Sequence, residues 1–366
     1  MTTLFTYVTS GVRGVYMKFA TLADIEQGRD NNLNLIRMIA ATGVLISHAW
    51  PVSTGVIEDQ PFATLLNGID LGMISVYIFF AISGYLIAQS YDRDPKLTHF
   101  WTARALRIFP ALLVVLLITA LVLAPIITVA TVDAVLKEAP EYILRNFTLF
   151  SLDQFLPGVF KGNPVGGAIN IPLWTLSHEL LCYFLVTLLG LAGILKHPRL
   201  MLLVWILFVL VYAMTLYLEP EKRLVALAKL AFPFMIGALF FVWRKRLPMS
   251  WWIGIALALI ALAAHGSVVF REIFVFTLVY WVFLFGYLPT GSVRAYNRLG
   301  DYSYGIYIYA FPIQQLIVFS GVTTPMMNIL LAFPLALACA VLSWTFVENP
   351  ALALARRLRA PRRANI

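Results

Sequence analysis

The sequence predicts an all-α fold, a polytopic membrane bundle of about ten transmembrane helices. Hydrophobic residues make up 61% of the 366 positions and charged residues only 12%, which is about half the charged share of a soluble globular domain. Apolar runs of helix length also recur from residue 34 to residue 347. This composition leaves little room for a separate soluble domain.

Ten apolar runs set the order of the expected helices. Each has about 17–22 residues, the length with which a helix crosses the hydrocarbon layer. The longest connection, residues 131–171, contains the stretch LPGVFKGNPVGGAINIP. We expect an irregular surface loop there, and loops of that length are often functional. In chain order, the runs lie near residues 34–51, 70–90, 109–130, 172–192, 200–218, 224–243, 250–269, 273–289, 303–320 and 327–347.

The basic residues predict the orientation of the bundle. If the N-terminus is cytoplasmic, the inner segments carry nineteen Lys and Arg residues and the outer segments carry six, as the positive-inside rule requires. The net charge of +9 therefore indicates membrane topology, and not nucleic-acid binding. Both termini are expected in the cytoplasm. The six outer residues are Lys137, Arg145, Lys161, Lys222, Arg223 and Arg271.

Two segments flank the predicted spans. Residues 1–30 form a cytoplasmic lead-in that lacks the apolar core and cleavage site of a signal peptide, and Met17 offers an alternative start. The tail, residues 351–366, is rich in arginine and suits anionic lipid headgroups on the cytoplasmic side. Cys182 and Cys339 lie far apart in apolar runs, so we expect neither a disulfide nor a metal site.

The first predicted span carries two ionisable side chains, Arg37 and His48. Such groups are costly inside a membrane and usually face a protein interior or a wet cavity. Eleven positions separate them, which is about 16 Å along a helix and brings them back to nearly the same face. Arg37 then lies in the inner half of the span and His48 in the outer half. A snorkelling arginine and a structural histidine are the simpler alternatives.

A second basic pair precedes the third span, in HFWTARALRIFP. Arg104 and Arg107 are three positions apart and therefore neighbours on one helix surface. Paired guanidinium groups at the inner end of a membrane helix suit phosphate, which arginine binds in a bidentate way. From the spacing alone, ordinary membrane anchoring explains the pair better.

An acidic residue, Glu179, lies in the fourth span, within LWTLSHELLCYF. Trp174, Ser177, His178 and Tyr183 flank it, and a carboxylate at this depth needs a partner or a cavity. His178 points about 100° away on a helix and need not pair with it. Glu179 can orient an imidazole on another helix, bind a hydroxyl of a substrate, or make a structural hydrogen bond.

Three other polar positions interrupt apolar runs. Ser83 and Gly84 permit close helix packing in the second span. Asp301 lies at the inner start of the ninth span, in GDYSYGIYIYAFP. Glu348 lies at the inner end of the tenth, where an arginine would neutralise it.

Together these motifs resemble acyltransferase family 3, a family of integral membrane acyltransferases that mostly modify bacterial surface sugars. Arg37 and His48 match its R-X10-H signature, and Arg104 and Arg107 match its RXXR motif. FFAISGYLI is similar to its FFxxSGFxx segment. The likeness extends over residues 31–350, which the resemblance identifies as a membrane acyltransferase domain.

Two later segments extend the resemblance and show where it departs. LWTLSHELLCYF is similar to the LWSLxxExxFY segment of the family, with Glu179 at the acidic position. GDYSYGIYIYAFP is similar to its GxxSYxxYxxHxP segment, but Ala310 stands where many members carry histidine. That histidine is therefore dispensable or specialised in this chain.

The resemblance implies an acyl-CoA-dependent O-acyltransferase in the bacterial inner membrane. Acetyl-CoA is the usual donor, and the acceptor is a hydroxyl of a cell-surface or lipid-linked glycan. His48 is then the catalytic base or a transient acyl carrier, and Glu179 orients His48 or the acceptor. The phosphates of CoA are expected on Arg37, Arg104 and Arg107. The acceptor is expected near Trp174, Ser177 and Tyr183.

Two other classes of function remain open from the residues alone. A multi-pass transporter of a glycan or lipid intermediate also needs buried charges, although paired halves around a midplane site are not apparent here. A membrane scaffold without chemistry fits the intramembrane Arg, His and Glu residues poorly. Besides membrane lipids and the glycan acceptor, no partner is predicted.

Overall fold

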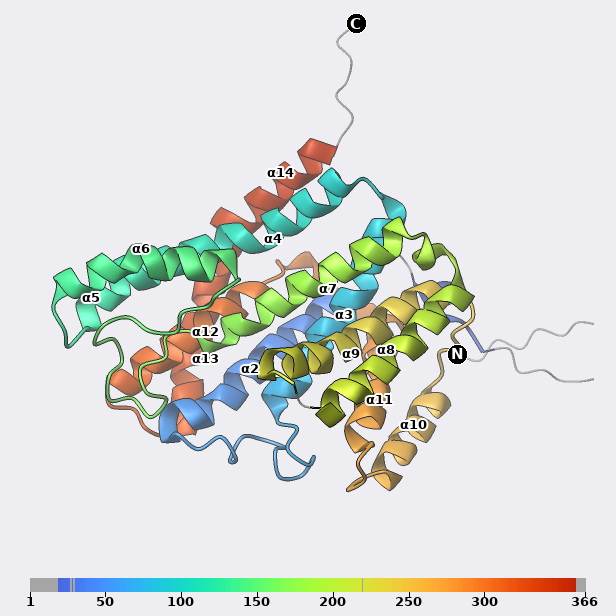
Figure 1. The fold of residues 1–366 in the computed structure, drawn as a ribbon, viewed down its shortest axis with the longest axis horizontal. Coiled ribbons are helices and arrows are strands. Elements are labelled where there is room, and N and C mark those ends of the chain that lie inside the picture. Colours follow the sequence, from blue (N-terminus) through green and yellow to red (C-terminus); the bar gives the residue numbers. More distant parts are fainter. Residues whose placement is uncertain (1–18, 27, 29, 219, 360–366) are drawn as a thin grey trace, which may run out of the picture.

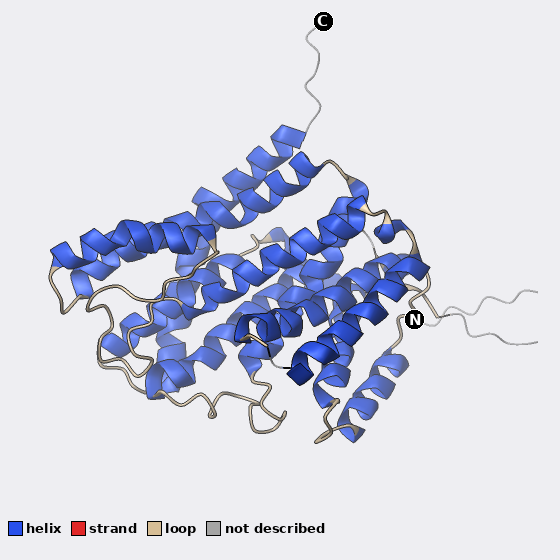
Figure 2. Cartoon of the chain, in the orientation of Figure 1, coloured by secondary structure: helices blue, strands red, loops and turns tan. Residues whose placement is uncertain are grey.

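The structure, a computed structural model, describes residues 19–26, 28, 30–218 and 220–359. Over these residues the chain forms helices joined by loops, without a β-sheet (Figure 2). Residues 1–18 of the predicted lead-in, with Met17, and residues 360–366 of the predicted tail lie outside this part. The long helices pack side by side in one bundle (Figure 1).

Eight helices within the described residues are long and apolar enough to cross a membrane. The predicted polytopic helical bundle is confirmed, and each of the ten predicted spans falls on a helix. The eight are α2 (Leu33–Thr54), α3 (Leu71–Arg93), α4 (Leu97–Ile118, with its continuation to Ile127), α7 (Trp174–Leu191), α8 (Pro198–Leu218), α9 (Lys222–Trp243), α11 (Phe270–Tyr287) and α13 (Pro325–Ser343, with its continuation to Arg359).

The other two predicted spans are shorter helices. The first, α10 (Trp251–Ala263), has 13 residues, and the second, α12 (Ser303–Phe319), has 17. Protein surrounds most of α12, since 14 of its residues are buried. This explains how α12 accommodates two glutamines: Gln314 donates to the carbonyl of Leu45 at 2.9 Å, and Gln315 to that of Ala168 at 2.6 Å.

The closest helix packing joins α3 and α9, side by side in the middle of the bundle (Figure 1). A Cβ atom on Gly84 would lie 1.9 Å from the carbonyl oxygen of Phe234, and one on Gly237 would lie 2.1 Å from that of Ala81. Neither position has room for a side chain, so the two backbones are in direct contact. The predicted packing role of Gly84 is confirmed.

Two long helices run on beyond a single span. The helix α4 passes through a π-helical turn (Thr119–Leu123) into α5 (Ala124–Ile127), and α13 passes through another (Trp344–Glu348) into α14 (Asn349–Arg359). The extension α14 lies along the first half of α4 (Figure 1). It therefore brings the start of the predicted tail against the predicted RXXR segment.

The prediction of an irregular loop over residues 131–171 is wrong for its first half. Val132–Thr148 forms the helix α6, whose N-cap residue Thr131 accepts a hydrogen bond from the backbone of Ala134 at 3.2 Å. Its sequence, VDAVLKEAPEYILRNFT, alternates polar and apolar faces, a pattern that a search for uniformly apolar runs overlooks. Irregular chain follows from residue 149 to residue 170.

Contacts between connections agree with the predicted topology. Among predicted inner segments, Leu22 in α1 (Leu22–Ile25) donates to the carbonyl of Leu247 at 2.9 Å. His265, near the outer end of the predicted span 250–269, contacts the carbonyl of Leu65 in a predicted outer segment at 2.9 Å. The connections thus gather at two ends of the bundle. Which end faces the cytoplasm stays a prediction.

Candidate active site

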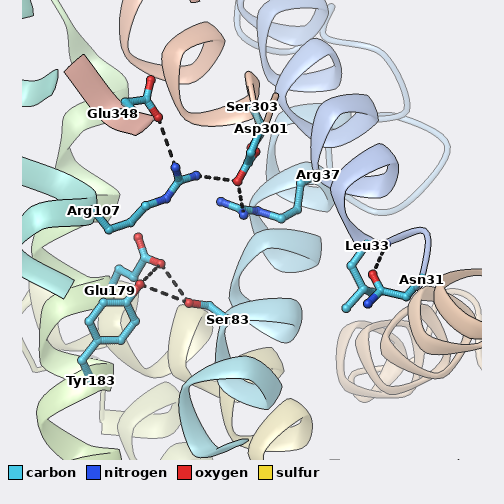
Figure 3. Close-up of polar contacts among 10 residues, drawn as sticks. All are labelled: Asn31, Leu33, Arg37, Ser83, Arg107, Glu179, Tyr183, Asp301, Ser303 and Glu348. Carbon is cyan, nitrogen blue, oxygen red and sulfur yellow. Dashed lines mark hydrogen bonds and ion pairs between the residues drawn. The ribbon is translucent and has the colours of Figure 1, made fainter. Parts of the chain in front are cut away.

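Four ionisable side chains from four elements form an ion cluster at the predicted inner end of the bundle (Figure 3). Asp301 accepts from Arg37 at 2.6 Å and from Arg107 at 2.7 Å, through the same oxygen, Oδ2. Arg107 also reaches Glu348 at 3.1 Å, as the sequence predicted for an arginine beside this acid. The side chain of Glu348 is 1% exposed. Two positive and two negative charges therefore compensate each other.

The carboxylate of Asp301 holds this cluster together. Asp301 lies just before α12, outside the spanning helices, and Ser303 Oγ donates to its Oδ1 at 2.6 Å. Burial alone would raise the pKa of Asp301, but the two arginines and Ser303 outweigh burial and lower the pKa to about 2. Asp301 is therefore ionised at any physiological pH, and its charge compensates those of Arg37 and Arg107.

Arg104 lies outside the ion cluster, although it is one turn from Arg107 on α4. Its guanidinium lies 5.9 Å from the ring centroid of Phe100. Its Nε is buried without a hydrogen-bond partner, and Arg104 makes no salt bridge within the described part of the chain. Of the three arginines predicted to hold phosphates, Arg104 is the one without a carboxylate partner.

Glu179 lies opposite α3 and is held by two hydroxyl groups (Figure 3). Its Oε1 accepts from Ser83 Oγ at 2.9 Å and from the phenol of Tyr183 at 2.5 Å. No contact between Glu179 and His48 is present, so the structure does not place the carboxylate to orient that imidazole. Glu179 lies near enough to Arg104 for their charges to interact.

The polar residues before Glu179 bond to their own turn of helix. Ser177 Oγ donates to the carbonyl of Trp174 at 2.8 Å. The Nδ1 atom of His178 lies 2.9 Å from the same carbonyl, and its ring meets the Trp174 ring edge-on at 5.1 Å. His178, which the sequence predicted need not pair with Glu179, thus makes its contacts within the first turn of α7.

His48 lies in the predicted outer half of α2, half-buried against α12. Its ring packs edge-on against Phe311, with centroids 5.5 Å apart. Within the described residues, neither ring nitrogen makes a hydrogen bond, so both are available to a substrate. The preceding residue, Ser47, donates to Asp70 at 3.1 Å, and Asp70 also accepts from the backbone of Met73 at the start of α3.

A family model described as an acyltransferase domain matches residues 30–347. The chain belongs to acyltransferase family 3. It is a membrane O-acyltransferase, because the family model describes an acyltransferase domain, a relative over most of its length is named an O-acetyl transferase, and the helices form a membrane bundle. The transporter and scaffold alternatives are therefore set aside.

Three curated relatives resemble this acyltransferase. The O-acetyl transferase of Shigella phage Sf6 is 28% identical over 88% of this chain and 96% of its own length. Nodulation protein 10 of Rhizobium leguminosarum bv. viciae is 27% identical over 92% of this chain and 96% of its own. Acyltransferase MdmB of Streptomyces mycarofaciens is 29% identical over 42% of this chain and 37% of its own. No solved structure matches.

The acyltransferase thus brings together some of the predicted site residues and separates others. Arg37 and Arg107 meet at Asp301, and Glu179 meets Tyr183, while His48 lies apart from both groups. Sequence reasoning missed Asp70, although an aspartate directly before an apolar helix is a typical N-cap signal. Asp70 is also the carboxylate whose charge acts on His48.

Proposed function

We propose that this acyltransferase moves an acyl group, most simply acetyl, from cytoplasmic acyl-CoA to a hydroxyl of a cell-surface or lipid-linked glycan. One observation carries the proposal: His48 is half-buried in the outer half of α2, and neither of its ring nitrogens has a hydrogen-bond partner in the described structure. An imidazole nitrogen without a hydrogen-bond partner can accept the proton of a hydroxyl group bound beside it. The name of the phage relative, O-acetyl transferase, supports the acetyl group.

In the proposed reaction, His48 takes the proton from the acceptor hydroxyl. The oxygen attacks the thioester carbonyl, the carbon–sulfur bond breaks, and an ester bond forms. The proton then passes from His48 to the departing thiolate of CoA. In the variant with a carrier, His48 attacks the thioester carbonyl and displaces the CoA thiolate. The acceptor oxygen then attacks the acyl-imidazole, the bond to the ring nitrogen breaks as the ester forms, and the acceptor proton passes to the thiolate.

The donor would enter from the cytoplasmic end, where the arginines gather. Arg104, without a carboxylate partner, is the residue that we assign first to a phosphate of CoA. Arg37 and Arg107 would contact the donor only along the rim of their cluster with Asp301. Glu179, with Tyr183, would bind or orient the acceptor hydroxyl, near the predicted acceptor residues Trp174 and Ser177.

The proposed setting is the inner membrane of a bacterium, with both termini in the cytoplasm. The positive-inside distribution of charge supports this orientation. It places Arg104 on the side that holds acyl-CoA and His48 toward the side of surface glycans. The acyl group would therefore cross most of the bilayer within the bundle.

The test uses purified full-length protein and acetyl-CoA labelled in the acetyl group. We expect turnover or a trapped acyl-enzyme with the wild type, and a loss of about 10²–10⁴-fold in His48→Ala. His197→Ala, which changes an exposed histidine between α7 and α8, serves as the matched control and should keep its activity.

Two outcomes would contradict the proposal at different points. Full activity in a folded His48→Ala variant would remove His48 from the chemistry. A wild type that consumes neither acetyl-CoA nor succinyl or longer acyl-CoA would exclude CoA thioesters as the donor.

A further inference from the structure

Two arginines from different helices lie together where α14 packs on α4. Arg359, in the last turn of α14, donates from Nη2 to the backbone carbonyl of His99 at 3.1 Å. Arg104 lies five positions after His99 on α4, close enough for the two guanidinium charges to repel each other. Bringing like charges together needs a compensating interaction.

Both arginines carry an unused hydrogen-bond donor. The Nε atoms of Arg104 and Arg359 are buried and have no hydrogen-bond partner. A buried donor without a partner is unfavourable, particularly on a charged group. Arg107, on the same helix as Arg104, shows the opposite state, because two carboxylates accept from it.

The nearby acids are already engaged. Near Arg104, Glu179 accepts from Ser83 and Tyr183. Near Arg359, Asp94 lies 2.9 Å from Nδ1 of His99. That hydrogen bond is the main reason why the pKa of Asp94 is lowered, and the charge of Arg359 adds a smaller effect. Neither carboxylate forms a hydrogen bond with Arg104 or Arg359, so the two buried Nε groups keep no acceptor among the described residues.

We propose that Arg359 and Arg104 together bind a phosphate group of the acyl donor. The inference rests on the proposed function, and it adds to the predicted site a residue of α14 that lies beyond the family match at residues 30–347. Guanidinium groups bind phosphate through paired, charge-assisted hydrogen bonds. A phosphate between α4 and α14 would accept from both Nε groups and remove the repulsion between the two charges.

The test measures binding of CoA to full-length protein in nanodiscs of phosphatidylcholine. We expect Arg359→Ala to raise the Kd about 10-fold or more, and Arg359→Lys, which keeps the charge but loses the fork, to raise it less. Arg356→Ala removes an exposed arginine of the same helix and is the matched control. Its Kd should stay that of the wild type.

A double variant tests whether the two arginines share one phosphate. The Kd of Arg104→Ala/Arg359→Ala should then rise less than the product of the two single effects. Equal Kd values for Arg359→Ala, Arg359→Lys and Arg356→Ala would overturn the proposal. A second result would also overturn the proposal: phosphatidylglycerol that competes with CoA for the wild type but not for Arg359→Ala. The two arginines would then bind a lipid headgroup.

The test separates this inference from the proposed function. If the wild type binds CoA and consumes acetyl-CoA while Arg359→Ala does the same with unchanged Kd, only the role of Arg359 fails. If the wild type neither binds CoA nor consumes acetyl-CoA, the donor itself is wrong. Thermal unfolding of each variant shows whether a loss of binding reflects a loss of structure.

Discussion

At the scale of single residues, Asp301 decides how the predicted arginines behave. The sequence indicates that Arg37, Arg107 and Glu348 lie toward the inner ends of their helices. It does not indicate that one oxygen of Asp301 accepts from both arginines, because the partners are 264 and 194 positions away along the chain. Pairing over such separations depends on helix packing, which apolar patterns alone do not specify.

We expect Asp301→Asn to destabilise the protein strongly. The change leaves the buried charges of Arg37 and Arg107 without their shared acceptor, and breaking a buried pair costs about 3–5 kcal/mol. Thermal unfolding in detergent measures the effect. Asp30→Asn is the control. The carboxylate of Asp30 lies 2.6 Å from the guanidinium of Arg294, but the Asp30 side chain is 59% exposed. Loss of this exposed ion pair should cost about 0–1 kcal/mol.

The pH dependence of the stability difference between wild type and Asp301→Asn is a second readout. The pKa of Asp301 falls from 3.8 to about 2 on folding. Its contribution to stability is therefore fully present above about pH 3.8 and is lost as the pH falls toward 2. The difference in the free energy of unfolding between wild type and Asp301→Asn should be constant from pH 8 to pH 5 and should shrink below pH 4. A gap that already closes between pH 7 and pH 5 would contradict the assignment.

At the scale of elements, the length of the apolar runs predicts most of the helices. The remaining helices need a search for amphipathic patterns. The ten predicted spans all fall on helices because burial in lipid or protein requires uniformly apolar runs. The helix α6 escaped this criterion because half of its surface is polar, and α14 because it is rich in arginine. Neither can cross a membrane on composition, but both pack against α4.

We expect Gly84→Ala to disrupt the contact between α3 and α9. The added methyl group would lie 1.9 Å from a backbone oxygen, and backbone cannot rotate away as a side chain can. Overpacking of this kind costs about 1–3 kcal/mol or more, which thermal unfolding would detect. Gly254→Ala is the control, since its nearest neighbour is the Trp281 side chain at 3.0 Å. Equal unfolding midpoints for the two variants would refute the close packing.

At the scale of the whole molecule, the alternation of charge predicts which end of the bundle faces the cytoplasm. In the structure, the predicted inner connections lie at one end of the bundle and the predicted outer connections at the other. The predicted site residues are divided between the same two ends. The ion cluster and Arg104 lie toward the predicted inner end, and His48 lies in the outer half of its helix.

We therefore expect opposite labelling of cysteines placed at the two ends. In a chain with Cys182 and Cys339 replaced by serine, Lys161→Cys should react with a membrane-impermeant maleimide on intact cells. Lys245→Cys should react only after lysis. Both lysines are exposed, so accessibility does not differ otherwise. Labelling of Lys245→Cys on intact cells would reverse the topology and, with it, the side from which the donor enters.

The ion cluster also imposes an order on biogenesis. Arg107 is synthesised 194 residues before Asp301, a delay of roughly 10–40 s at about 5–20 residues per second. Throughout that interval, two arginines sit in nascent membrane helices without their acceptor. The early helices must therefore stay near water, headgroups or the insertion machinery until α12 arrives. Asp301, in the last quarter of the chain, then fixes two helices from the first third in their places in the bilayer.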